Sequence, residues 1–196
     1  MADLAAVLVA RERPHRDLTG RWEGAVAVPI QGEEIWCIKR AETMSHHARE
    51  LAFPGGRRDE SDSSLEAAAL RELWEELGIA LDDIEVLGQL TPVPTATSRF
   101  ALHPWVVALA PAAEPRPAPA EVAALIRTPV AAFFEGGVPY RAVTFGQGRT
   151  SPIFDFAEGS MYGASAHVLE ELLEVYGELA GARLPEPELT TSIPWQ

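Results

Sequence analysis

Cysteine is nearly absent from this chain of 196 residues, and Cys37 is its only one. An internal disulfide is therefore excluded, and a reducing, cytoplasmic setting is the expected location. Long apolar runs are absent too, since no segment approaches the roughly 18 apolar residues of a membrane span. The N-terminal stretch MADLAAVLVARERP is apolar but short and lacks the basic start of a signal peptide, so we predict an amphipathic helix there.

Basic residues are scarce: 16 lysines and arginines stand against 29 acids, which gives a net charge of −13. This balance argues against a partner such as nucleic acid or an anionic membrane, because both require a basic surface. The basic residues are unevenly placed, however, and a group of them between positions 39 and 71 could serve a phosphate-bearing small molecule or be ordinary surface charge. The group consists of Lys39, Arg40, Arg49, Arg57, Arg58 and Arg71.

Hydrophobic residues make up 47% of the chain, which contains no evident repeat. Length and composition predict one domain over 1–196, with a core at about 22–180, a short N-terminal helix and an extended C-terminal tail. Mixed strands with few helices indicate an α/β layered domain.

The predicted elements follow from apolar periodicity and from turn residues. Strands are predicted over 22–30 and 34–40 as a hairpin or two neighbouring strands, from 51 to a break at Pro54-Gly55-Gly56, and over 84–95, 100–110, 140–146 and 151–157. A proline-rich loop is predicted over 111–121, a short helix over 128–137 and a C-terminal helix over 163–181.

The stretch LRELWEELGI, residues 70–79, places three glutamates within about 100° of one another on a predicted helix. Ser63 and Glu66 fit a capping box and Gly78 fits a C-terminal stop, so the helix is predicted over about 64–77. Like charges at this spacing destabilise a helix unless a cation neutralises them. The candidate ligands are Glu72, Glu75 and Glu76.

Two further features of this helix bear on its interpretation. Leu70, Leu73 and Leu77 form a separate stripe that can face a core, whereas Ala68 and Ala69 lie on the carboxylate side and are predicted to leave room for a ligand. Mg²⁺ takes oxygen ligands and bridges protein carboxylates to substrate phosphates, which makes it the expected occupant. The alternative is a solvated acidic face.

The segment GRRDESDSSLEAAALRELWEELGI, residues 56–79, resembles the signature of the Nudix hydrolases. The matching positions are Arg71, Glu72, Leu73, Glu75, Glu76, Gly78 and Ile79. The first half departs from the signature: Asp62 stands where the family has a glutamate, and the loop is one residue longer. The resemblance implies an α/β/α sandwich with a mixed central sheet and a hydrolase that cleaves diphosphate bonds.

The upstream stretch CIKRAETMSHHARELAFPGG, residues 37–56, is similar to one branch of that family, the coenzyme A pyrophosphatases. Arg40 and the run Phe53-Pro54-Gly55-Gly56 are kept, whereas Lys39, Ser45 and Arg49 replace residues usual in the branch. The branch implies hydrolysis of coenzyme A or its thioesters to 3',5'-ADP and 4'-phosphopantetheine. ADP-ribose, NADH, a dinucleotide or a nucleotide sugar is the alternative substrate, and a nucleotide-sensing module without catalysis or an acidic helix of an interaction protein is the alternative class.

The resemblance also implies roles for individual residues. Glu72, Glu75 and Glu76, with the Gly56 carbonyl, would hold Mg²⁺ or Mn²⁺, and Arg71 would orient Glu72. The general base would be Glu72 or a distal acid, for which Glu121 is the first candidate and Glu114 the second. Family members are often dimers, so a homodimer is among the assemblies that the resemblance allows.

Several other residues are weaker candidates. Arg40, Arg57, Arg49 and Arg58 are predicted to contact substrate phosphates, because arginine matches phosphate oxygens in a bidentate way. His46 and His47 are adjacent, so on a strand they would point to opposite faces and make poor joint metal ligands. The aromatic residues Phe53, Phe100 and Trp105 could stack on a base, although aromatics in strand patterns are more often part of a core.

Overall fold

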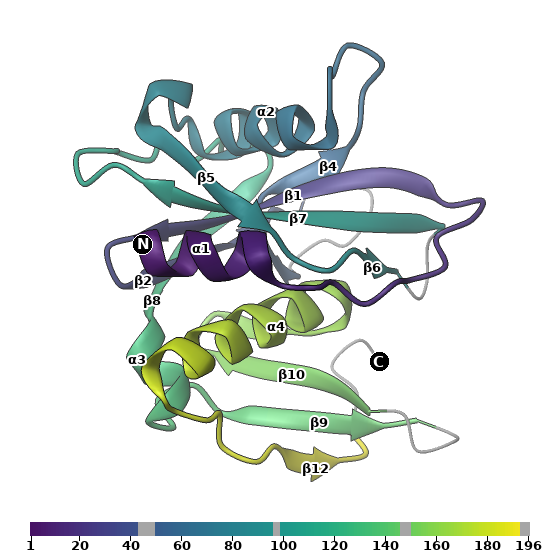
Figure 1. The fold of residues 1–196 in the computed structure, drawn as a ribbon, viewed down its shortest axis with the longest axis vertical. Coiled ribbons are helices and arrows are strands. Elements are labelled where there is room, and N and C mark those ends of the chain that lie inside the picture. The colour runs from purple at the N-terminus through teal and green to yellow at the C-terminus, as the bar shows by residue number, and fades with distance from the viewer. Residues whose placement is uncertain (43–49, 96–98, 146–149, 193–196) are drawn as a thin grey trace.

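A mixed sheet of eight strands forms the centre of the computed structural model, which describes residues 1–42, 50–95, 99–145 and 150–192 (Figure 1). Across the sheet lie β3 (Leu51–Ala52), β2 (Glu34–Arg40), β1 (Trp22–Gln31), β7 (Phe100–Leu109) and β5 (Ile84–Gln89). Additional strands are β4 (Gly55–Arg57) beside β1, β6 (Val93–Pro94) beside β7 and β8 (Val122–Pro129) beside β2. The β1–β7 pair is parallel and β1–β2 is antiparallel, so the sheet is mixed, as predicted.

Helices cover both faces of this sheet (Figure 1). Helix α2 (Leu65–Leu77) lies on one face, and α1 (Ala2–Ala10) and α4 (Gly163–Ala180) lie on the other. The predicted α/β/α sandwich is confirmed. The short helices η1 (Leu81–Asp83) and α3 (Val130–Phe134) connect strands.

A second sheet adds a fourth layer that the sequence did not predict. It consists of β11 (Gly159–Met161), β10 (Thr150–Phe156), β9 (Tyr140–Thr144) and β12 (Glu188–Thr190). Helix α4 lies between the two sheets (Figure 1). The extended tail contributes β12, which pairs in parallel with β9. The prediction of a single domain over 1–196 stays a prediction.

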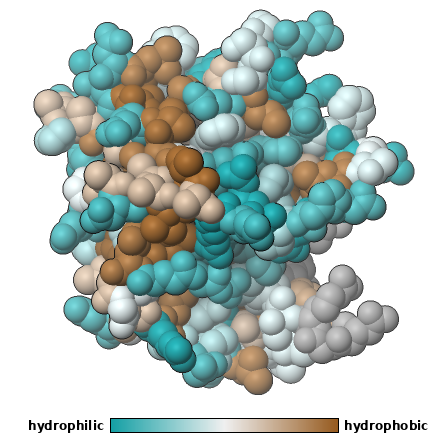
Figure 2. Space-filling view, in the orientation of Figure 1, coloured by the Kyte–Doolittle hydropathy of each residue, from teal (hydrophilic) through white to brown (hydrophobic). Residues whose placement is uncertain are grey.

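The surface around α1 changes character along the helix (Figure 2). Apolar residues gather on the side where α1 begins, and hydrophilic residues dominate near its other end. The predicted helix is present and buries Leu4 and Leu8, but its predicted amphipathic character is wrong, because Asp3 is its one polar residue and the apolar Val9 is 77% exposed. Among the described residues, no helix is long and apolar enough to cross a membrane.

Small residues let α2 approach the sheet closely. On β1, Ala25 and Ala27 pack in the apolar cluster beneath α2, whereas Val26 and its alternate neighbours pack in the cluster beneath α1 and α4. Ala68 and Ala69 of α2 are 0% exposed in the first of these clusters. The prediction that they leave room for a ligand is therefore wrong: their small size serves the packing of helix on sheet.

The ends of α2 are fixed by local hydrogen bonds. Ser64 caps the helix, and its side chain accepts a bond from the Ala67 N–H at 3.0 Å. The capping box predicted at Ser63 and Glu66 is thus wrong by one residue, because the longer loop delays the helix start. Gly78 ends the helix in the left-handed conformation, as predicted, with φ of 66°.

The loop 111–121 closes the C-terminal end of α2. The Arg116 N–H donates to the Leu77 carbonyl at 2.6 Å, and the Ala118 N–H donates to the Glu76 carbonyl at 2.9 Å. These carbonyls have no partner within the helix, so the loop satisfies them. The same contacts fix the position of the segment that carries Glu121.

The strand β3 ends before Pro54, so the predicted break is present, but Gly55-Gly56 belong to a new strand, β4, that was not predicted. β4 pairs with β1 through Gly24, Ala25 and Val26. A Cβ atom at Gly55 would lie 2.4 Å from the Ala25 carbonyl oxygen and 2.5 Å from Val26 Cγ1. Glycine is required because β4 lies closer to β1 than a side chain permits.

The strand β8 was not predicted, since no element was assigned to residues 122–127. Its alternation is visible in hindsight: Val122, Ile126 and Thr128 are buried, while Arg127 and Pro129 are exposed. The pairing of β8 with β2 supplies the long-range contacts that favour a strand there.

Replacing Gly55 with alanine tests the close approach of β4 to β1. We expect Gly55→Ala to lower the free energy of unfolding by about 2–3 kcal/mol, because the new methyl group meets strand backbone that cannot move aside. Gly137→Ala is the matched control, since its Cβ would lie 3.3 Å from the nearest atom. Urea denaturation of both variants measures the difference, and equal stability of the two variants would contradict the packing argument.

Candidate active site

Glu76 is the most buried acid on α2, with 1% of its side chain exposed. Its Oε2 accepts a hydrogen bond from the Gly55 N–H at 3.0 Å, and its Oε1 lies 3.5 Å from Arg40 Nη1. Burial raises the pKa of Glu76 to about 7, and Arg40 and the Gly55 N–H oppose that rise while Glu72 and Glu121 add to it. A carboxylate is therefore held in a place where its charge is poorly compensated.

Glu72 lies one turn earlier, against β4. A Cβ atom at Gly56 would lie 2.4 Å from Glu72 Oε1, so a side chain at this position would displace the carboxylate. Burial raises the pKa of Glu72, the hydrogen bond from Arg71 lowers it, and the charges of Glu75 and Glu121 raise it further.

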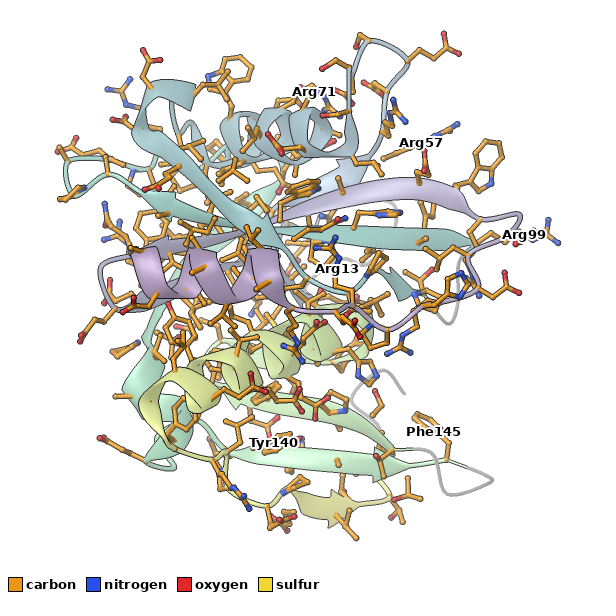
Figure 3. The ribbon with its side chains drawn as sticks, in the orientation of Figure 1. Arg13, Arg57, Arg71, Arg99, Tyr140 and Phe145 are labelled. Carbon is orange, nitrogen blue, oxygen red and sulfur yellow. The ribbon has the colours of Figure 1, made fainter. Side chains whose placement is uncertain are left out.

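Arg71 connects the helix to the preceding loop (Figure 3). Its Nε and Nη2 donate to the two oxygens of Asp62 at 3.0 and 3.1 Å, and its Nη1 donates to Glu72 Oε1 at 2.9 Å and to Glu75 Oε2 at 3.1 Å. Nη2 also donates to the Arg57 carbonyl at 3.1 Å. Arg71 thus holds two of the three helix acids and both ends of the loop.

Asp62 completes the loop. It is 8% exposed, and its Oδ2 also accepts the Asp59 N–H at 2.8 Å. The hydrogen bond from Arg71 holds the pKa of Asp62 below its ordinary value. The shorter acid reaches Arg71 because the loop that carries it bends back through the Asp59 contact.

Of the two distal acids predicted as a general base, Glu121 lies near this acidic cluster. The Glu121 carboxylate raises the pKa values of Glu72 and Glu76, so its charge acts on both. Glu114 is exposed on the loop 111–121. Arg49 and the pair His46 and His47 lie outside the described residues.

The arginines and aromatics take different positions. The Arg57 guanidinium lies 4.6 Å from the centroid of the Trp22 ring, and Arg58 pairs with Glu23 at 3.2 Å. Phe53 is buried in the core. The other two aromatics considered for base stacking, Phe100 and Trp105, are half-buried. Trp22 is 56% exposed and is not among the aromatic residues that the sequence predicts for base stacking, although it begins a strand that is buried from Gly24 to Ile30.

The residues present fit a divalent cation in their chemistry. Among the described residues, no three acidic, histidine or cysteine side chains converge closely enough to hold a metal as they stand. Glu72 and Glu75 nevertheless meet at a single nitrogen of Arg71, and Glu75 is 41% exposed on its side chain and so is able to rotate. Mg²⁺ and Mn²⁺ prefer oxygen ligands such as these carboxylates, and a bound cation would offset the repulsion between them.

Comparison with known proteins places the chain in a family. The family model described as NUDIX domain matches residues 20–143, and the chain belongs to the Nudix family. A relative called uncharacterized Nudix hydrolase NudL from Enterobacter sp. (strain 638) is 36% identical over 130 residues, which cover 65% of this chain and 67% of that protein. The protein of the same description from Salmonella dublin is 31% identical and covers 84% of this chain and 88% of its own length.

Solved structures share the fold. A NUDIX hydrolase from Nitrosomonas europaea superposes with a TM-score of 0.56 at 12% identity, over 90% of this chain and 81% of that one. A C. elegans Ap4A hydrolase gives a TM-score of 0.52 at 15% identity, over 82% and 98% of the two chains. Because it belongs to the Nudix family, the chain is a pyrophosphohydrolase, and Nudix hydrolases act on small-molecule nucleotide substrates and use divalent metal ions.

Replacing Glu76 with glutamine should stabilise the metal-free protein at pH 8. The folded-state pKa of about 7 exceeds the ordinary 4.5, so folding favours the protonated acid and stability falls as pH rises between these values. Above pH 7 the charged form costs roughly 3 kcal/mol, and Glu76→Gln removes much of that cost, so we expect a gain of about 1–3 kcal/mol. Thermal unfolding in EDTA at pH 5 and pH 8 measures it, and a variant no more stable than wild type at pH 8 would count against the buried charge.

Removing Asp62 should loosen the whole loop. We expect Asp62→Ala to lower the free energy of unfolding by about 3 kcal/mol, because a partly buried guanidinium loses its main partner. Asp59→Ala is the matched control in the same loop, because Asp59 donates to Asp62 through its backbone N–H, which alanine keeps. Chemical denaturation of both variants, with Mg²⁺ present and absent, provides the comparison, and a similar loss in the two variants would refute the role given to Asp62.

Proposed function

We propose that this Nudix enzyme hydrolyses the diphosphate bond of coenzyme A or its thioesters, giving 3',5'-ADP and 4'-phosphopantetheine, with Mg²⁺ or Mn²⁺ as cofactor. The retained Arg40 and Phe53-Pro54-Gly55-Gly56 support this substrate by their resemblance to the coenzyme A branch. ADP-ribose, NADH or a nucleotide sugar is the alternative within the same chemistry.

The observation that carries the proposal is the cluster of acids over the glycine strand. Glu76 is buried against Gly55, Glu72 lies against Gly56, and Arg71 links Glu72 to Glu75. A protein that needed only a solvated acidic face would have no reason to bury one of these acids. In the proposal Glu72, Glu75, Glu76 and the Gly56 carbonyl hold the metal.

The bound metal would activate a water and offset charge on the diphosphate oxygens. Arg71 keeps Glu72 in one orientation through the 2.9 Å bond, and burial raises the pKa of Glu72, which makes it a better proton acceptor. Glu72 or Glu121 would take the proton of the attacking water. Arg40, the last residue of β2, lies with its Nη1 3.5 Å from Glu76 Oε1 and would contact a substrate phosphate, and Arg57 and Arg49 are the other proposed phosphate contacts.

A hydrolysis panel tests the function. Wild type is incubated with Mg²⁺ or Mn²⁺ and coenzyme A, a thioester, ADP-ribose, NADH or a dinucleoside polyphosphate, and products are identified by mass. We expect 3',5'-ADP and 4'-phosphopantetheine from coenzyme A, and a kcat lower by roughly 100-fold or more in Glu76→Gln. Glu66→Gln on the same helix is the control and should keep its activity.

Two outcomes would decide against parts of the proposal. Activity confined to ADP-ribose would reject coenzyme A and leave the site assignment standing. Near-normal activity of Glu76→Gln would reject the site. Comparison of Glu121→Gln with Glu114→Gln tests the distal acids, because only an acid that takes the proton should lower kcat and flatten the pH profile; if neither variant does so, Glu72 is the base.

A further inference from the structure

Trp22 is exposed where a strand residue of its size is ordinarily buried. It opens β1, and its ring is 56% exposed, whereas Val26, Val28 and Ile30 on the same face of the strand are buried. The chain carries five tryptophans, and one other described tryptophan, Trp74 on the outside of α2, is similarly exposed at 57%. Trp22 differs from Trp74 in its surroundings.

Trp22 forms part of a layered group of flat side chains. The Arg57 guanidinium lies over its ring at 4.6 Å from the centroid, and Phe100 is its Cα partner on β7, so the two aromatic residues stand side by side on one face. In a protein with a net charge of −13, an arginine over an exposed aromatic ring is a local positive site. Indole rings and guanidinium planes are the groups on which nucleobases stack.

Hydrogen bonds to backbone carbonyls hold this group in place. The Trp22 N–H donates to the Arg99 carbonyl at 2.7 Å, and Arg21 Nη1 donates to the carbonyl of Phe100 at 3.3 Å and to that of Thr95 at 3.0 Å. Figure 3 shows Arg99 and Arg57 toward the same end of the molecule. A fixed aromatic group binds a flat ligand with little loss of conformational entropy.

The group is connected to the candidate active site through Gly24. A Cβ atom at Gly24 would lie 3.0 Å from the Gly56 carbonyl oxygen, 3.2 Å from Leu102 Cδ2 and 3.6 Å from Phe100 Cδ1, so Gly24 lies between the proposed metal ligand and the side chains of Leu102 and Phe100. Trp22 is two residues from Gly24, about 7 Å along a strand. Arg57 directly follows Gly56, and its carbonyl accepts from Arg71. A ribose separates a base from its phosphates by a comparable distance.

We propose that Trp22, with Arg57 over its ring, is the stacking site for the nucleobase of the substrate, and that Phe100 extends it. This assignment rests on one part of the proposed function, namely that the substrate carries a nucleobase. It therefore holds equally for coenzyme A and for the alternative nucleotides. It makes Trp22 a determinant of specificity for the nucleoside half of the substrate, while the helix acids act on the diphosphate.

The test measures binding without turnover. Adenosine 5'-monophosphate and ribose 5-phosphate, which differ only by the base, are titrated against wild type, Trp22→Ala, Trp22→Phe and the control Trp74→Ala in the presence of Mg²⁺. We expect Trp22→Ala to weaken binding of the monophosphate roughly 5- to 100-fold and Trp22→Phe to weaken it by less than about 3-fold. Binding of ribose 5-phosphate should be unchanged in each variant, and Trp74→Ala should match wild type.

Intrinsic fluorescence gives a second readout that a purely structural role would not move. Stacking of adenine should quench tryptophan emission in wild type and Trp74→Ala, and that quenching should disappear in Trp22→Phe although the nucleotide still binds. Three results would overturn the proposal: equal nucleotide affinity in Trp22→Ala and wild type, an equal loss for both ligands in Trp22→Ala, or no binding of the monophosphate to wild type at millimolar concentration.

The stacking site and the proposed function can fail separately. If coenzyme A is hydrolysed but its KM is the same in Trp22→Ala as in wild type, the stacking site is wrong and the function stands. If coenzyme A is not hydrolysed but the monophosphate binds with quenching that depends on Trp22, the substrate is wrong and the stacking site stands.

Discussion

The paired hydrogen bonds between Arg71 and Asp62 are the interaction on which the site depends. They join the end of the loop to a residue in the middle of α2, and they leave Arg71 Nη1 directed at Glu72 and Glu75. Without a fixed guanidinium, the two carboxylates would repel each other and turn toward solvent. One arginine therefore sets the loop conformation and the orientation of the acids together.

The close approach of β4 to β1 complements that arrangement from the other side. Gly55 supplies an N–H to Glu76, and Gly56 leaves the space that Glu72 occupies. Both acids are brought where burial raises their pKa values, so the metal-free site is electrostatically unfavourable. A cation bound there would relieve the cost, which links metal affinity to folding stability.

The sequence predicts the parts of this site that depend on local patterns. The spacing of Glu72, Glu75 and Glu76, the stop at Gly78 and the C-terminal helix follow from helical periodicity and from the conformational freedom of glycine. The errors concern contacts between elements that are distant in sequence: Ala68 and Ala69 meet the alanines of β1, and β8 pairs with β2. Single-sequence patterns carry no information on such partners.

The fourth layer also reaches the candidate active site, through residues that no motif marks. The Arg40 N–H donates to the Glu50 carbonyl at 3.0 Å, and the Glu50 side chain hydrogen-bonds to Tyr162 at the start of α4. Lys39 Nζ donates to the Glu158 carbonyl at 2.7 Å, in the turn between β10 and β11. Arg40 is the residue that meets Glu76, so the second sheet and α4 brace the strand from which Arg40 projects. The position of Arg40 beside the buried Glu76 therefore depends also on hydrogen bonds that the second sheet and the start of α4 make to β2 and to Glu50.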